Sequence, residues 1–139
     1  MATTKTVTDR PAERLEIRSS DDVVRVRQKV RVFAVESGLS LVDQTKIVTA
    51  ASELARNTLD YGLGGTVDIQ LTAAPRRGVR LTFVDQGPGI KDIELALRDG
   101  YSSGKGLGLG LSGARRLCNE FSIQSTPGAG TSVTIARWK

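Results

Sequence analysis

Two stretches of the chain repeat their apolar residues at the spacing of an amphipathic helix. Between residues 20 and 36, apolar side chains recur three or four positions apart, which predicts a helix with one polar face. Any of residues 19–22 (SSDD) could cap its start, and Gly38 follows its end. The same spacing predicts a second helix over residues 42–59, ended by the glycine-rich stretch YGLGG.

The rest of the chain is dominated by short runs in which apolar and polar residues alternate, which is typical of half-buried strands. The runs cover residues 15–19, 66–74, 79–86, 121–126 and 131–138. The turn sequences PRRG and PGAG separate the last four runs into pairs, which predicts two β-hairpins.

Two further helices are expected between the hairpins, over residues 91–100 and from residue 111 to about 121, with the glycine-rich stretch GKGLGLGLSG leading into the second. Strands grouped in hairpins and separated by helices indicate the α+β class. We expect a two-layer sandwich in which a mixed, mostly antiparallel sheet is covered by helices on one face. Residues 1–13 are polar and predict a flexible arm, so that residues 14–139 form a single domain.

Composition narrows the chemistry that this domain can perform. The 139 residues include one cysteine and no histidine, which excludes an intrachain disulfide and a structural zinc cluster and indicates a cytoplasmic protein. No apolar run approaches the roughly 18 residues that span a membrane. The net charge of +5 fits an anionic ligand, whereas the scattered basic residues and few aromatic residues argue against nucleic acid.

Two polar residues end apolar rows in the predicted sheet. Asp85 continues the row of Val79, Leu81 and Phe83, and Thr131 begins a row of the last strand. A carboxylate at the end of a buried row requires a hydrogen-bond donor. Asp85 is equally explained as the start of the DQGPG turn, but two such polar ends at one mouth of the sheet favour a mostly apolar pocket for a purine.

The second predicted helix carries Glu53 and Asn57 one turn apart on one face, beside a separate stripe that packs against the core. An acid and an amide at this spacing can act on a magnesium ion and its waters. For an isolated pair, a solvated helix face is the more common explanation.

The glycine-rich stretch before a helix predicts a phosphate site, because glycine lets the backbone approach a ligand and a helix N-terminus favours an anion. The pattern is neither a Walker motif nor a good dinucleotide fingerprint. Taken alone, it is equally consistent with a flexible loop.

In combination, these motifs resemble the GHKL ATP-binding fold of gyrase, the Hsp90 chaperones, sensor histidine kinases and MutL. SELARN, DQGPGI, GLGLGLSGARRL, EFSI and GAGT occur in that order and are most similar to small serine/threonine switch kinases of the RsbT type, relatives of the anti-sigma factor SpoIIAB. The resemblance covers about residues 13–138. It implies a catalytic Glu53, a magnesium-binding Asn57, and nucleotide-binding residues Asn57, Asp85, Gly87, Gly89, Ile90, Lys105, Gly106, Leu107, Gly108, Leu109, Gly110 and Thr131.

The same resemblance implies an ATP- and Mg²⁺-dependent protein serine/threonine kinase that works as a regulatory switch. Its expected substrates are STAS-domain proteins of a stressosome or anti-sigma antagonists, and a PP2C-type phosphatase or a sigma factor is a further expected partner. The segment from Ile90 to Gly104 corresponds to the ATP lid. Lys105 either neutralises a terminal phosphate or is a solvated loop lysine, and Arg56 is better explained by a surface ion pair.

Two other functions remain open at this point. The chain could be an ATP-dependent binding switch, either an anti-sigma factor or a phosphatase activator, with little kinase turnover. A catalytic fragment of a histidine kinase is disfavoured, because the chain has no histidine to accept the phosphoryl group. Phosphorylation of a STAS partner would distinguish the serine/threonine kinase from the binding switch.

Overall fold

A computed structural model describes residues 10–98 and 107–139 of the chain. Five strands form one sheet: β1 (Glu13–Ile17), β2 (Gly65–Thr72), β3 (Gly78–Asp85), β4 (Glu120–Thr126) and β5 (Gly130–Trp138). Their order in the sheet is β1-β2-β3-β5-β4, and all four neighbouring pairs are antiparallel. The sheet is thus more regular than the mixed arrangement that the sequence led us to expect, while both predicted hairpins are confirmed.

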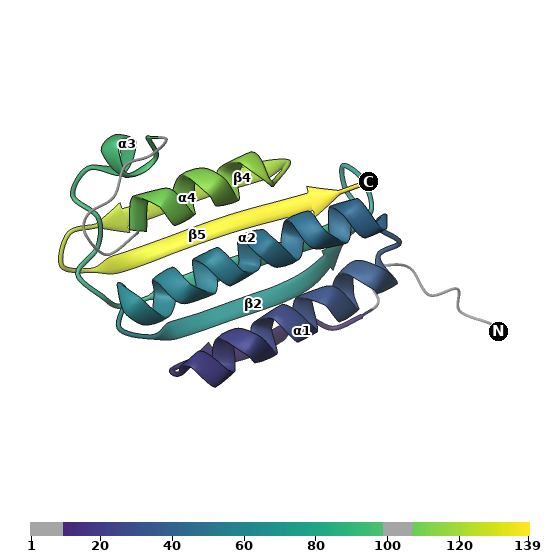
Figure 1. Ribbon diagram of the computed structural model, residues 1–139, viewed down its shortest axis with the longest axis horizontal. Helices are drawn as coiled ribbons and strands as arrows, with labels where there is room; N and C mark the ends of the chain where they lie inside the picture. Colours follow the sequence, from purple (N-terminus) through teal and green to yellow (C-terminus); the bar gives the residue numbers. More distant parts are fainter. Residues whose placement is uncertain (1–9, 99–106) are drawn as a thin grey trace.

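Helices cover one face of this sheet, which confirms the predicted α+β sandwich. The helices are α1 (Ser20–Glu36), α2 (Leu41–Asp60), α3 (Ile93–Ala96) and α4 (Leu107–Arg116). Figure 1 shows α1, α2 and α4 lying side by side across the sheet, with α3 at the end of the molecule where α2 finishes and β5 begins. No helix in the described part of the chain is long and apolar enough to cross a membrane.

The two long helices begin and end where their sequences signal it. The Ser19 side chain accepts a hydrogen bond from the backbone N–H of Asp22 and caps α1, and Ser40 caps α2 in the same way through Asp43. Gly38 follows α1 with a φ of 82°, a left-handed conformation that glycine adopts without strain.

The core lies between the helices and the sheet. The apolar stripe of α2 that the sequence predicts, Ile47, Ala51, Leu54 and Thr58, is buried. It faces the inward row of β3, where Val79, Leu81 and Phe83 are also buried. Burial of this continuous apolar surface is the main force that holds α2 against the sheet and fixes the position of its last turns.

Two predicted helix boundaries are wrong. The helix expected over residues 91–100 is the single turn α3, which ends at Ala96 with Leu97 as its C-cap. The helix expected from residue 111 begins earlier, at Leu107, so that Gly108 and Gly110 belong to its first turns. The cost of glycine in a helix is only about 1 kcal/mol per residue, which the packing of α4 against α2 and α3 can offset.

Near the N-terminus, Arg10 contacts the body of the domain. Its guanidinium pairs with Glu36 at 2.8 Å and with Glu13 at 3.3 Å, and it lies 4.6 Å from the centre of the Phe33 ring. The division into an arm (1–13) and a domain (14–139) stays a prediction, because residues 1–9 lie outside the described part of the chain.

Candidate nucleotide-binding site

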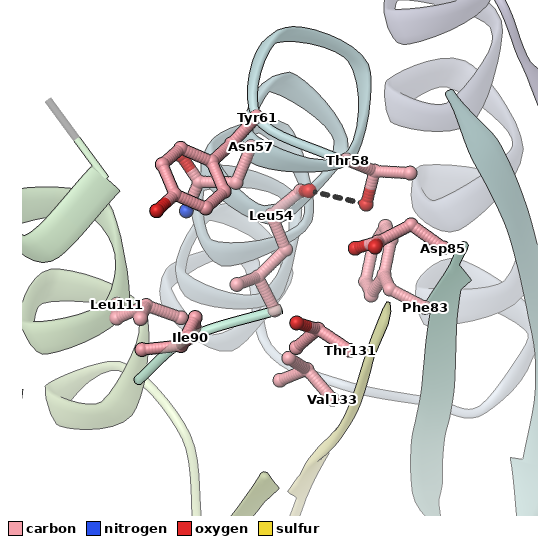
Figure 2. Close-up of a pocket in the computed structure, with 10 residues that line it drawn as sticks. All are labelled: Leu54, Asn57, Thr58, Tyr61, Phe83, Asp85, Ile90, Leu111, Thr131 and Val133. Carbon is pink, nitrogen blue, oxygen red and sulfur yellow. Dashed lines mark hydrogen bonds between the residues drawn. The ribbon is translucent and has the colours of Figure 1, made fainter. Parts of the chain in front are cut away.

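One hollow brings together the polar ends that the sequence singled out. It is lined by residues from α2, β3, β5, α4 and the turn after β3, namely Leu54, Asn57, Thr58, Tyr61, Phe83, Asp85, Ile90, Leu111, Thr131 and Val133. Figure 2 shows Asn57 and Tyr61 on one side, Asp85 and Phe83 on another, and Ile90 with Leu111 closing the hollow opposite Asp85. Its walls are mainly apolar and its polar groups few, as in a site for a small organic ligand.

Asp85 and Thr131 lie directly opposite each other in the pairing of β3 with β5. This register confirms the expectation that the two polar ends meet at one mouth of the sheet. The rest of both rows is apolar, with Phe83 opposite Val133. The Asp85 carboxylate and the Thr131 hydroxyl therefore lie on neighbouring strands at the edge of the core.

Partial burial raises the pKa of the Asp85 carboxyl above its usual range, and hydrogen bonds from the backbone N–H groups of Gly87 and Thr131 act against that shift. The Gly87 N–H donates to Asp85 Oδ1 at 2.9 Å. A half-buried carboxylate in these surroundings gains from any further hydrogen-bond donor that enters the hollow. The exocyclic amine of adenine is a donor of this kind.

Asn57 is positioned by α2, one turn before the helix ends. Its Nδ2 atom is buried and has no hydrogen-bond partner among the described residues. An unsatisfied buried amide is costly unless a ligand completes it. Because the oxygen and nitrogen of an amide are assigned from their partners, either end of Asn57 is available to a ligand, and its oxygen suits Mg²⁺.

Four glycines let the backbone close tightly around Asp85. A Cβ on Gly62 would lie 2.6 Å from Asp85 Oδ2, and one on Gly87 would lie 2.8 Å from the backbone of Gly62. A Cβ on Gly65 would collide with the carbonyl oxygen of Val84, and one on Gly130 with that of Asp85 itself. The backbone around Asp85 is therefore tightly packed, and Gly62 lies against the carboxylate itself.

The enclosed part of the hollow measures about 20 Å³, which is room for about one water molecule. This volume is smaller than a purine base. Ile90 begins the segment that the resemblance assigns to the ATP lid, and Leu111 follows that segment in the sequence.

The comparisons with known proteins agree with this geometry. Residues 42–139 match the model of the family described as histidine kinase-, DNA gyrase B-, and HSP90-like ATPases. The chain belongs to this family. The match confirms the resemblance to the GHKL fold and spans every element that lines the hollow.

Two individual relatives show which members of the family the chain resembles. The chain is 44% identical over 118 residues to the serine/threonine-protein kinase RsbT of Bacillus subtilis, covering 84% of this chain and 89% of that one. It is 28% identical to the anti-sigma F factor of Thermoanaerobacter sp. over 81% of this chain and 82% of that one. The likeness to the RsbT type and to anti-sigma factors is thus confirmed.

A solved histidine kinase domain from the Erythrobacter litoralis blue-light activated histidine kinase has the same fold, with a TM-score of 0.54 at 18% identity. The match covers 84% of this chain and 59% of that chain. It supports the fold of the ATPase family for the described residues.

The structure brings together some of the predicted site residues and leaves others apart. Asn57, Asp85, Ile90 and Thr131 line the hollow. Gly87 and Gly89 are buried in the turn after β3, where a Cβ on Gly89 would collide with the Thr126 carbonyl oxygen.

The other predicted residues stand differently. Glu53 is exposed on α2, one turn before Asn57. The backbone of residues 107–110 forms the start of α4, so Leu107, Gly108, Leu109 and Gly110 are not in a loop as expected. Lys105 and Gly106 lie outside the described residues. Arg56 pairs with Asp60 at 3.7 Å and donates to Ser20 Oγ at 3.3 Å, which agrees with its interpretation as a surface ion-pair residue.

Sequence reasoning missed Gly62 and Ser125, which contact the predicted site residues directly. Gly62 packs against Asp85, and the Ser125 hydroxyl lies 2.8 Å from Thr131 Oγ1. Ser125 is detectable in retrospect, because it precedes the turn between β4 and β5 and shares a face with Ile123. Nothing in the glycine-rich sequence YGLGG marks Gly62 as the member that touches Asp85.

Proposed function

We propose that this chain is an ATP-dependent protein serine/threonine kinase that works as a regulatory switch and phosphorylates STAS-domain proteins in a partner-switching pathway. The observation that carries the proposal is that Asp85 and the unsatisfied amide of Asn57 line the same hollow of an ATPase-family fold. Its extension to kinase activity is supported by the 44% identity to a protein named serine/threonine-protein kinase RsbT.

At the base end, Asp85 is suited to accept a hydrogen bond from the 6-amino group of adenine. The apolar walls formed by Leu54, Phe83 and Val133 exclude water from that bond, which strengthens it. Guanine presents a carbonyl oxygen where adenine presents the amine, so the Asp85 carboxylate would repel it. This difference makes ATP the expected nucleotide.

At the phosphate end, Asn57 is the described residue that would hold Mg²⁺, together with the phosphates of ATP. The magnesium ion, when bound, neutralises charge that develops on the transferred phosphoryl group. The first backbone N–H groups of any helix have no partner within the helix, so the start of α4 is suited to the phosphates, because a helix N-terminus favours negative charge. Lys105 is proposed as an additional cationic partner of the terminal phosphate.

Glu53 is proposed as the residue that orients or deprotonates the target hydroxyl. It lies one turn from Asn57 on the same helix, and it is exposed, so that a protein substrate can reach it. A carboxylate in this place would accept the proton that a serine or threonine hydroxyl loses as its oxygen attacks phosphorus. Phosphoryl transfer otherwise depends mostly on positioning and charge neutralisation.

A second function, an ATP-dependent binding switch, is favoured by the relatives that are named anti-sigma F factors. In that case the chain would hold a sigma factor or activate a PP2C-type phosphatase, and ATP would set its affinity for the partner. The two functions are compatible in one protein. We further propose that the protein acts in the cytoplasm, where ATP and such partners are available.

The test is transfer of the terminal phosphate of labelled Mg-ATP to a panel of purified STAS-domain proteins, followed by identification of the phosphorylated amino acid. The wild type is expected to produce phosphoserine or phosphothreonine on one of them. Glu53→Gln should retain ATP binding and lose about 10²–10⁴ in transfer rate, whereas Asn57→Ala should lose the Mg²⁺-dependent part of ATP binding.

Asp60→Asn is the matched control, because Asp60 is an exposed carboxylate on the same helix. It should leave both quantities unchanged. ATP binding without transfer to any member of the panel would favour the binding switch. A fully active Glu53→Gln variant would remove Glu53 from the chemistry.

A further inference from the structure

Ser125 on β4 holds three groups at the edge of the hollow through a single hydroxyl. Its Oγ accepts a hydrogen bond from the backbone N–H of Ile90 at 2.7 Å and donates to the carbonyl oxygen of Gly130 at 3.2 Å. It also lies 2.8 Å from Thr131 Oγ1. Ser125 does not line the hollow itself, whereas Ile90 and Thr131 do.

One arrangement of hydrogens satisfies all three bonds of the Ser125 hydroxyl at once. A serine hydroxyl has one hydrogen to donate and two lone pairs to accept with. The Ile90 N–H uses one lone pair, and the Gly130 carbonyl, which can only accept, uses the hydrogen. Only one lone pair then remains for Thr131, so all three bonds are satisfied together when the Thr131 hydroxyl is the donor in the bond between the two side chains.

This direction has a consequence for the hollow. A threonine hydroxyl that donates its only hydrogen to Ser125 presents lone pairs elsewhere. Thr131 lies opposite Asp85 in the pairing of the two strands, and the Asp85 carboxylate accepts hydrogen bonds as well. At the Asp85–Thr131 edge of the hollow both side chains therefore act as acceptors, which suits a base that carries a donor at its 6-position.

We propose that Ser125 is a positioning residue that determines base specificity, by keeping the Thr131 hydroxyl turned into an acceptor toward the bound base. The inference rests on the proposed ATP site and deepens it. The same hydroxyl fixes the backbone of Ile90, whose side chain forms part of the wall. Ser125 thus connects the base end of the site to the point where the chain leaves the turn after β3.

Removal of the Ser125 hydroxyl would have two separate effects. The Thr131 hydroxyl would be free to rotate and donate into the hollow, where a 6-oxo base such as hypoxanthine could accept it. The backbone N–H of Ile90 would also lose its acceptor. A side chain that merely filled space would produce neither effect.

The experiment compares the affinities of the full-length protein for ATP and ITP, whose bases differ at the 6-position. Ser125→Ala is expected to shift the ATP-to-ITP affinity ratio toward ITP by about five- to ten-fold, the effect of exchanging one donor for an acceptor. Ser122→Ala on the exposed face of β4 is the control and should not change the ratio. Ser125→Thr, which retains a hydroxyl, should restore it.

Two further measurements separate this inference from a general loss of structure. Thr131→Val removes the hydroxyl that Ser125 orients, so adding Ser125→Ala to that variant should leave the ratio unchanged, whereas two independent effects would add. Amide exchange at Ile90 in the nucleotide-free protein should be faster in Ser125→Ala than in wild type.

The outcomes can be assigned without ambiguity. An unchanged ATP-to-ITP ratio in Ser125→Ala, with or without weaker binding of both nucleotides, would overturn the proposal. So would a ratio shift of equal size in the Thr131→Val background. Failure of the wild type to bind ATP would instead refute the proposed function and is a different result.

Discussion

Replacement of Gly62 by alanine tests whether backbone packing around Asp85 makes the nucleotide site. Gly62 follows the end of α2, and its N–H donates to the Asn57 carbonyl oxygen at 3.1 Å. A Cβ there would lie 2.6 Å from both Cβ and Oδ2 of Asp85 and would also collide with its Cγ. Either the carboxylate must rotate away or the loop that carries Gly62 must retreat.

The size of the effect follows from these contacts. A methyl group inserted into a packed site costs about 1–3 kcal/mol. Rotation of the carboxylate would break its bond to the Gly87 N–H and its alignment with an incoming amine, and a hydrogen bond to a charged group contributes about 1.5–3 kcal/mol. We therefore expect ATP affinity to fall at least ten-fold and the free energy of unfolding to fall by about 1–3 kcal/mol.

The assay pairs calorimetric ATP titration with denaturant unfolding of the same preparations. Gly113→Ala is the matched control, because a Cβ on that α4 glycine would meet nothing within 4 Å; it should bind ATP normally and unfold no more easily than wild type. If Gly62→Ala bound ATP with wild-type affinity, the packing around Asp85 would not be needed for the site, and our reasoning on these glycines would be refuted.

Two further predictions concern stability and reactivity. Hydrogen bonds from Arg137 lower the pKa of Asp43, so this pair stabilises the fold above about pH 4 and loses its contribution as the pH falls through the lowered pKa. Asp43→Asn should therefore lower the free energy of unfolding by about 1–2 kcal/mol at pH 7 and by progressively less toward pH 2. The exposed Asp21→Asn is the control, and a loss of stability that does not change with pH would contradict this prediction. Burial raises the pKa of Cys118 to about 12, so the native protein should react with a thiol-specific reagent at pH 7.5 far more slowly than the unfolded chain; equal rates would show that the thiol is accessible and ionisable.

The fold could be predicted largely because its signals are local and repeated. Alternation in the strands and the three- and four-residue spacing in α2 each report one buried face, and the turn sequences mark both hairpins. That Asp85 and Thr131 each end a core-facing row was also predictable, because side chains in a strand alternate strictly and the apolar residues fix the parity of each row; their direct pairing comes from the structure.

Contacts between distant segments were not predictable in the same way. A Cβ on Gly62 would collide with Asp85, which lies 23 positions further along the chain on β3. The composition of the YGLGG stretch does not show which of its residues faces β3. The helix α4 begins at Leu107, four residues before the position that the low helix propensity of glycine indicates. The three hydrogen bonds of the Ser125 hydroxyl join groups that only the folded sheet edge brings together.

The central claim is that the hollow beside Asp85 is an adenine-nucleotide site, and calorimetric titration of ATP and GTP into wild type and Asp85→Asn tests it most directly. ATP should bind the wild type well and GTP poorly, because guanine offers an oxygen to the Asp85 carboxylate where adenine offers a donor. Asp85→Asn should weaken ATP binding about ten-fold or more, since a hydrogen bond to a charged group is lost. Equal affinities for ATP and GTP in the wild type, or undiminished ATP binding by Asp85→Asn, would contradict the account.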